Sequence, residues 1–210
     1  VTQSSLHGCR RHRRAMDKSK STSLAESLKK GLGATLSGPP GVSSPNQQFC
    51  GDIDMRIARD GTWFYHGSPI GRTQLVKLFS TVLKRDSIGD YWLETPVEKC
   101  RIQVEDAPFL AVEMMVEGSG VNQRLRFRTN VDDNVIAGSD NPIRVEIDPD
   151  SDEPSPYVLV RGGLEALIAR AVFYDLVELA GEEERDGERQ FGVWSDGVFF
   201  PLGNPGEIVD

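Results

Sequence analysis

The chain has 210 residues, enough for one large domain or two small ones. Its 38% hydrophobic and 27% charged residues are typical of a globular protein, and no apolar run reaches the ~20 residues of a membrane-spanning helix. Residues 1–31 hold eight Lys/Arg against two Asp/Glu, whereas residues 32–210 hold 16 against 30. Because an acidic body repels a phosphate backbone, we expect no general nucleic-acid binding by the folded part. The lack of a long apolar run favours no membrane insertion, and we expect a cytoplasmic location.

Residues 1–48 are predicted to form a disordered basic tail and linker. The run Arg10–Arg14 shows no apolar periodicity, although a nucleic-acid arm or a transit peptide would also be rich in arginine. No apolar segment follows the basic start, so we expect no secretory signal. Residues 23–32 favour a short helix, and Gly38–Pro45 favours a linker.

An N-terminal α+β domain is predicted over residues 49–96. Asp54–Ala58 and Thr62–His66 flank a D-G turn, which is typical of a β-hairpin. Apolar residues recur at three- and four-residue steps from Arg72 to Arg85 and predict a helix. A strand is predicted over Asp90–Thr95.

A C-terminal α+β domain is predicted over residues 97–203, followed by a tail over 204–210. Alternating residues predict strands over Val97–Glu105, Phe109–Glu117, Gln123–Val131, Asn134–Ala137 and Ile143–Ile147, and a last hairpin over Gln190–Trp194 and Val198–Pro201. For two apolar faces to meet one core, paired residue numbers in the hairpin of strands 109–117 and 123–131 must add to an odd sum. That register places Glu113 beside Arg126 or Arg128, and Glu117 beside Arg124 or Asn122.

The stretch from Tyr157 to Ala180 predicts a short strand, a turn at Arg161-Gly162-Gly163, and a long buried helix from Leu164. The order strand, strand, helix, strand describes residues 53–95 and also residues 143–194. We therefore predict an α+β fold with two related β-β-α-β units, mostly antiparallel sheets each packed on one helix.

Three cysteines, Cys9, Cys50 and Cys100, form no C-x-x-C pair and are odd in number. Their pattern favours a reducing compartment and argues against a disulfide framework. Cys100 shares a strand face with Ile102 and Val104, so we expect a buried, inert thiol there. A redox pair of Cys50 and Cys100 is the alternative.

A resemblance to a known family is carried by five segments: CGDIDMRIARDGTWFYHGSPIGR (50–72), TPVEK (95–99), VEDAPFLAVEM (104–114), RFRTNV (126–131) and VRGGLEALIARAVFYDLVEL (160–179). Over about residues 49–203 the chain resembles the bacterial family catalogued as domain of unknown function 1285. The resemblance implies a duplicated fold whose C-terminal half is similar to pleckstrin-homology domains. It also implies a nucleotide-like ligand between the two halves and a role in signalling, with no activity established.

Arg161, Gly162 and Gly163 are the first candidates for a ligand site. A helix N-terminus exposes free N–H groups, two glycines let an anion approach the backbone, and an arginine can clamp it. Arg128, Thr129 and Asn130 end a strand with suitable donors, and Arg72 is the matching group of the first unit. The alternatives are a tight glycine turn and an arginine stripe that is paired with carboxylates across the strands.

Most catalytic and cofactor chemistry lacks its residues in this chain. Neither a P-loop nor a Rossmann glycine pattern is present, and His66 is the single histidine of the predicted folded part. The spacing of Asp148, Asp150 and Asp152 fails the EF-hand pattern, so we expect no metal and no cofactor. Asp52 and Asp54 leave a carboxylate-based hydrolase as the weakest alternative.

These observations favour a non-enzymatic binding protein for an anionic, nucleotide-like small molecule. The alternative is an interaction module that binds a protein partner through a sheet edge or the acidic loop 148–153.

Overall fold

In the computed structural model of the chain, residues 48–185 and 187–203 are described. The predicted basic tail over residues 1–47, its helix over 23–32, and the tail over 204–210 lie outside these residues. We call residues 48–105 the N-terminal half and residues 109–203 the C-terminal half.

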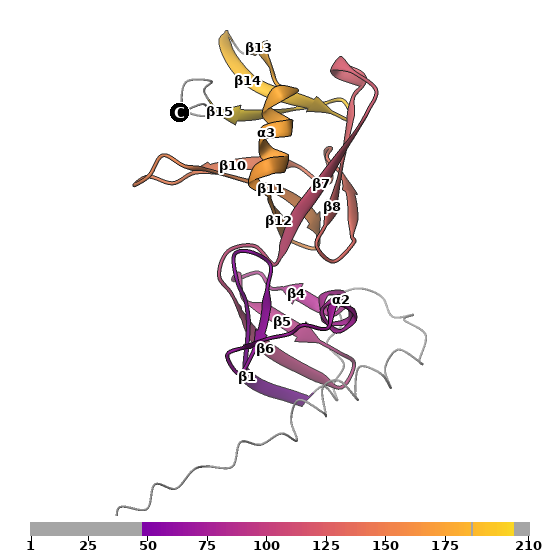
Figure 1. Cartoon of the computed structure of the whole chain (residues 1–210), viewed down its shortest axis with the longest axis vertical. Coiled ribbons are helices and arrows are strands. Elements are labelled where there is room, and N and C mark those ends of the chain that lie inside the picture. Colours follow the sequence, from indigo (N-terminus) through magenta and orange to yellow (C-terminus); the bar gives the residue numbers. More distant parts are fainter. Residues whose placement is uncertain (1–47, 186, 204–210) are drawn as a thin grey trace, which may run out of the picture. The chain divides into compact units, whose positions relative to one another are not determined.

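The described part of the N-terminal half contains one helix, α2 (Thr73–Thr81), and one six-stranded sheet. The strands are β1 (Gln48–Ile57), β2 (Trp63–Tyr65), β3 (Ser68–Pro69), β4 (Leu83–Arg85), β5 (Tyr91–Glu94) and β6 (Glu98–Val104). Their order in the sheet is β3-β2-β1-β6-β5-β4 (Figure 1). Two antiparallel three-stranded meanders flank α2 in sequence, and parallel pairing of β1 with β6 joins them.

The core of this half forms because alternate residues of the strands point to one face. Ile57, Trp63 and Leu93 are fully or almost fully buried there, and the Trp63 ring stacks on Phe79 of α2 with centroids 6.1 Å apart. The predicted D-G hairpin is confirmed. The predicted helix over residues 72–85 is too long, because its last residues form β4, which pairs with β5.

The described part of the C-terminal half contains helix α3 (Arg170–Glu178), a short 3-10 helix η1 (Gly120–Asn122), and two sheets. The strands are β7 (Phe109–Glu117), β8 (Arg124–Thr129), β9 (Asn134–Ile136), β10 (Ile143–Ile147), β11 (Pro154–Arg161), β12 (Leu164–Ile168), β13 (Gly181–Arg185), β14 (Glu188–Ser195) and β15 (Val198–Gly203). The six-stranded sheet, β10-β11-β12-β7-β8-β9, curls into a half-barrel, and β13-β14-β15 form a separate sheet (Figure 1).

The predicted register of the β7–β8 hairpin is confirmed. Glu113 lies opposite Arg128 and Glu117 lies opposite Arg124, so each pair adds to the same odd number. Leu125 and Phe127 are fully buried on the inner face, and the arginines of β8 point outward.

The predicted long helix from Leu164 is wrong. Gly162 and Gly163 have φ angles of +52° and +76°, and they form the two-residue turn of a hairpin between β11 and β12. Leu164, Ala166 and Ile168 alternate into the core as a strand, and the helix begins only at Arg170.

The described residues therefore form an α+β protein that is mostly sheet. The described N-terminal half contains three strands, a helix and three further strands, whereas the described C-terminal half has six strands before helix α3 and three after it, in place of the predicted β-β-α-β units. We expected a domain boundary between residues 96 and 97. Residues 98–104 instead form β6, which pairs within the first sheet. Division of the chain into separate domains, and the likeness of the C-terminal half to pleckstrin-homology domains, stay predictions.

Candidate functional site

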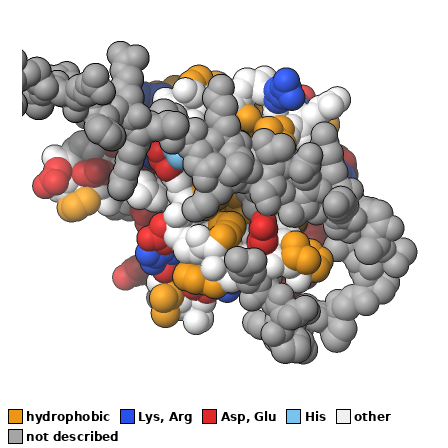
Figure 2. All heavy atoms as spheres, turned by 90° about the horizontal axis from the view of Figure 1, so that it is seen from below, with side chains coloured by type: hydrophobic (Ala, Val, Ile, Leu, Met, Phe, Trp, Pro, Cys, Tyr) orange, Lys and Arg blue, Asp and Glu red, His pale blue; other side chains and the backbone are white. Residues whose placement is uncertain are grey.

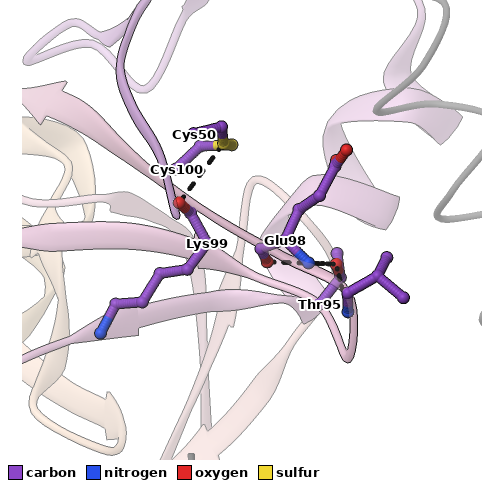
Figure 3. Close-up of a disulfide and its surroundings, with 6 residues drawn as sticks. Cys50, Thr95, Glu98, Lys99 and Cys100 are labelled. Carbon is purple, nitrogen blue, oxygen red and sulfur yellow. Dashed lines mark hydrogen bonds between the residues drawn. A yellow bond between two sulfur atoms is a disulfide. The ribbon is translucent and has the colours of Figure 1, made fainter. Parts of the chain in front are cut away.

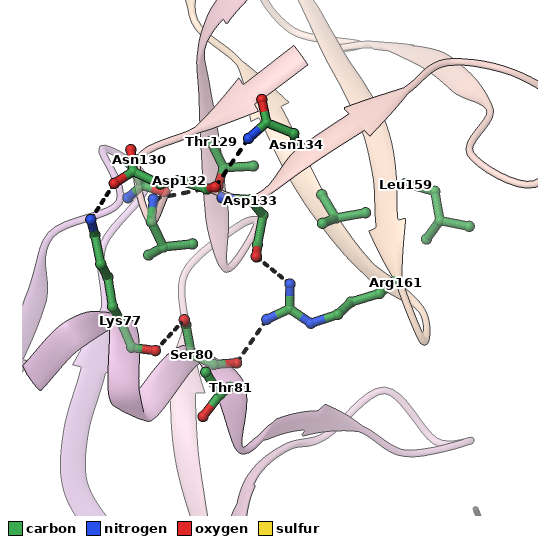
Figure 4. Close-up of polar contacts among 12 residues, drawn as sticks. Lys77, Ser80, Thr81, Thr129, Asn130, Asp132, Asp133, Asn134, Leu159 and Arg161 are labelled. Atoms are coloured by element: carbon green, nitrogen blue, oxygen red, sulfur yellow. Dashed lines mark hydrogen bonds and ion pairs between the residues drawn. The ribbon is translucent and has the colours of Figure 1, made fainter. Parts of the chain in front are cut away.

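The predicted site residue Arg161 lies where the two halves meet. It ends β11, and its guanidinium forms an ion pair with Asp133. The Nη2 group also donates to the backbone carbonyl of Ser80 in α2, at 2.8 Å (Figure 4). Its guanidinium lies 4.9 Å from the centroid of the Phe109 ring. Arg161 thus joins α2 of the N-terminal half to the loop after β8 and to the start of β7.

A second group of charges is built on the neighbouring aspartate. Asp132 accepts hydrogen bonds from Lys77 of α2 and from Arg128 of β8, the latter at 3.0 Å. Arg128 also donates to Glu113 at 2.5 Å. The hydrogen bond from Lys77 and then that from Arg128 hold the pKa of Asp132 below its usual value, because both stabilise the carboxylate.

We call Lys77, Ser80, Arg128, Asp132, Asp133 and Arg161 the seam. Its three cations come from three elements, and two adjacent aspartates of one loop bind all of them. The charged side chains are between about one third and one half exposed, so water and small solutes reach them.

Thr129 and Asn130 hold the seam loop in place through hydrogen bonds with the backbone. The Thr129 hydroxyl accepts from the Asp133 N–H at 3.0 Å, within the fully buried end of β8. Asn130 accepts from the Leu110 N–H and donates to the carbonyl of Gly61, at 3.3 Å. A side chain at Gly61 would come within 2.5 Å of Asn130, and its φ of +79° also favours glycine.

Gly162 and Gly163 do not open a helix, so the anion site predicted at a helix N-terminus is wrong. Gly162 and Gly163 form a hairpin turn, so they present no unpaired helical N–H groups. The Gly163 carbonyl accepts a long hydrogen bond of 3.3 Å from Arg85 of β4. The turn thus contacts the N-terminal half at the same end of β11 as Arg161.

Arg72 is the one predicted cation that joins no seam contact. It stands at the N-cap of α2 and is exposed, with no side-chain capping bond. Of the seven predicted residues, the structure brings Arg128, Thr129, Asn130 and Arg161 together around one loop. It places the glycines beside them and Arg72 at the far end of α2 from Ser80.

The carboxylates considered for hydrolysis have separate partners. Asp52 accepts two hydrogen bonds from Arg101, at 2.6 and 2.9 Å, which lower its pKa, and Asp54 lies 3.0 Å from His66. Asp148 accepts from the N–H groups of residues 150 and 151 and so closes a turn. In the part of the chain that the structure describes, no group of three or more His, Cys, Asp or Glu could hold a metal ion.

The sequence did not indicate an open groove in the C-terminal half. It measures about 370 Å³ and is lined by Arg126, Asn134, Val135, Ile136, Gly138, Ser139, Asp140, Asn141, Val160 and Asp196. Polar residues of both charges surround it, and its loop, Gly138 to Asn141, is closed by two backbone hydrogen bonds. The turn composition of this loop is visible in the sequence, but the hollow depends on β11 and on the turn after β14.

Cys50 and Cys100 form a disulfide between β1 and β6, with their Cα atoms 5.2 Å apart (Figure 3). The prediction of an inert thiol at Cys100 is therefore wrong. The residue is buried, as predicted, but its sulfur is bonded to that of Cys50. The expectation of no disulfide framework failed because parallel pairing of β1 with β6 brings together two cysteines that are 50 residues apart in sequence.

The charge distribution on the surface and the length of the helices bear on nucleic-acid and membrane partners. On the described part of the face in Figure 2, acidic, basic and hydrophobic side chains are interspersed, without a continuous basic patch. Among the described helices, none has both the length and the apolar character needed to cross a bilayer.

Comparisons with known proteins agree on one family. Residues 39–107 match the model of the N-terminal domain of DUF1285, a domain of unknown function, and residues 108–202 match that of its C-terminal domain. No match is found among the curated proteins.

Two solved structures are similar to the chain. A DUF1285 family protein from Silicibacter pomeroyi DSS-3 is 52% identical over 86% of this chain and 96% of its own, with a TM-score of 0.73. A DUF1285 family protein from Shewanella baltica OS155 is 28% identical over 60% of this chain and 91% of its own, with a TM-score of 0.47. From the two family models and the first of these structures, the chain belongs to the DUF1285 family.

Proposed function

We propose that this chain is a non-enzymatic binding protein whose seam accepts a small anionic, nucleotide-like molecule. One observation carries the proposal. Lys77, Arg128 and Arg161 come from three elements in both halves, and two adjacent aspartates of a single loop pair with all three, while Glu113 also pairs with Arg128. A phosphate-bearing ligand that took the place of these carboxylates would meet three cations at once.

Replacing the aspartates costs little free energy because the pairs are partly solvated. Half-exposed ion pairs contribute about 0–1 kcal/mol each, and salt screens them. A phosphate group carries more charge than a carboxylate and accepts two parallel hydrogen bonds from a guanidinium. A phosphate that takes the place of the Asp133 carboxylate at Arg161 therefore brings more negative charge and can accept two parallel hydrogen bonds from the guanidinium.

Binding at the seam would change how the two halves are coupled. Lys77 and Ser80 belong to α2, whereas Asp132 and Asp133 belong to the loop after β8. A ligand that releases the loop from α2 alters the contacts between the halves, which is the property that a role in signalling requires. This use of the site needs no catalytic group.

A thermal-shift experiment tests the proposal. The unfolding temperature of the wild type is measured with pyrophosphate and with nucleoside mono-, di- and triphosphates, alongside Arg161→Ala and Asp133→Asn. Arg124→Ala is the matched control, because Arg124 forms a similarly exposed pair with Asp196 at the other end of β8.

We expect an anion at about 100 times its Kd to raise the unfolding temperature of the wild type by roughly 5–10 °C. Asp133→Asn should respond at lower concentration, Arg161→Ala should not respond, and Arg124→Ala should behave as the wild type. The proposal is wrong if no anion shifts the wild type or Asp133→Asn, or if Arg161→Ala and the wild type respond equally.

A further inference from the structure

We propose that Cys50–Cys100 is a redox-responsive disulfide, opened by a low-molecular-weight thiol that attacks Cys50. The bond lies within the first sheet, and the proposal does not depend on the anion site. Three features carry it: the backbone around the pair, the unequal access to the two sulfur atoms, and the short piece of strand that the bond fastens.

The backbone accommodates both the oxidised and the reduced pair. The Cα separation of 5.2 Å lies inside the usual disulfide range of about 4.4–6.8 Å, and it is set by the parallel neighbours β1 and β6. The Sγ atom of Cys50 lies 3.3 Å from the carbonyl oxygen of Lys99, so the reduced thiol has an acceptor already in place. Neither state requires the strands to move apart.

Access to the two sulfur atoms is unequal. Cys50 is exposed, whereas Cys100 is only 2% exposed and pairs with the fully buried Leu93. Thiol–disulfide exchange depends on whether the attacking thiolate can reach the sulfur. Only Cys50 satisfies that condition in the folded chain, and Cys100 is therefore the leaving group.

The exchange balances with two equivalents of thiol. A thiolate attacks the Sγ of Cys50, the S–S bond breaks, and Cys100 leaves with the electron pair and takes a proton. A second thiolate then attacks the external sulfur of the mixed disulfide and releases Cys50 as a thiolate, which is protonated. Two thiols are oxidised to one small disulfide, and the protein disulfide is reduced to two thiols.

Reduction weakens the hold on the first residues of β1. Among the described residues before Cys50, Gln48 and Phe49 pair with β6, and a register irregularity follows at Gly51, whose φ is +73°. Phe49 is 65% exposed, and its ring lies 5.8 Å from that of Trp92. Without the disulfide, the contacts of residues 48–50 within the described part of the chain include two backbone pairs with β6 and the contact between the Phe49 and Trp92 rings.

The full chain is titrated in buffers of reduced and oxidised glutathione, with free thiols alkylated and mapped by mass spectrometry. Cys9→Ser is used as the background, so that thiol counts refer to the pair alone. We expect one two-electron transition within the range set by glutathione, and a fall in unfolding temperature of about 5–10 °C on reduction. Hydrogen exchange should quicken at residues 49–51 and change little at the core strand β5.

Two variants test the direction of attack. In Cys100→Ser, oxidised glutathione should form a mixed disulfide on Cys50. In Cys50→Ser, the adduct on Cys100 should form at least about ten times more slowly while the chain stays folded. The proposal fails if the wild-type pair stays oxidised in fully reduced glutathione, if it never oxidises, or if both single cysteines react at similar rates.

Discussion

Two joints in the molecule connect segments far apart in the sequence, and they use opposite chemistry. At the joint between the curled sheet and the β13–β15 sheet, the Ser195 hydroxyl is completely buried. It donates to the Ala137 carbonyl at 2.7 Å and accepts from the Leu125 N–H at 2.9 Å. At the seam, Arg161 and Asp133 are more than one third exposed and charged. The buried neutral joint excludes competitors, whereas the exposed charged joint can exchange its partners.

The largest expected effect is at the buried joint. Ser195→Ala leaves a buried N–H without its acceptor and a buried carbonyl without this donor, so it should lower the free energy of unfolding by about 1–3 kcal/mol. Chemical denaturation measures the change. Ser139→Ala is the control, because Ser139 is exposed in the groove loop and should change stability by no more than about 0.5 kcal/mol. Equal effects in the two variants would contradict the contrast between the joints.

A second buried contact, between β11 and the segment that links β6 to β7, should affect stability at high pH. Tyr157 is 5% exposed and donates to Asp106, in the segment that links β6 to β7, at 2.8 Å. Burial, and then the hydrogen bond to Asp106, raise the pKa of Tyr157 to about 12. The folded state thus favours the protonated phenol. Its contribution is complete below about pH 10, where the unfolded tyrosine ionises, and is lost as the pH rises towards 12.

We therefore expect the wild type to be more stable than Tyr157→Phe by roughly 1–2 kcal/mol at pH 8, and this difference to shrink between pH 10 and 12. Paired denaturation curves across that range measure it, with the variant correcting for all other groups that titrate there. A difference that stays constant up to pH 12 would show that the phenol is not held protonated.

The smallest stability effect is expected at the seam itself. Arg161→Ala removes a half-exposed ion pair and one hydrogen bond, so the free energy of unfolding should fall by about 1 kcal/mol or less. Raising the salt concentration should reduce the difference between wild type and variant further. If Arg161→Ala instead lowers the free energy of unfolding as much as Ser195→Ala does, the seam is a permanent joint and not one whose partners can exchange.

The sequence predicted local features of the fold better than long-range ones. The D-G hairpins and the odd-sum register of β7 with β8 follow from turn chemistry and from which face is apolar. The error at residues 164–168 arose because Leu164, Leu167 and Ile168 fit a helical period while Leu164, Ala166 and Ile168 fit a strand period. A Gly-Gly pair favours a two-residue hairpin turn, and that signal separates the two cases.

The candidate site could be predicted only in part. The donors Arg128 and Arg161 are recognisable by residue type, but their partners are not. Asp133 meets Arg161 only because the loop after β8 and the end of β11 converge on α2. The disulfide has the same origin, since only the parallel pairing of β1 with β6 brings Cys50 beside Cys100.

Direct titration of pyrophosphate by calorimetry tests the central claim, that internal carboxylates occupy cations which an external anion can take over. With Asp132→Asn and Asp133→Asn combined, both loop carboxylates are gone and only Glu113 still pairs with one of the three cations, so binding should be about ten times tighter than in the wild type. Adding Arg161→Ala to that double variant should abolish the gain. If the double variant binds no more tightly than the wild type, or if neither binds at millimolar pyrophosphate, the seam is not an anion site.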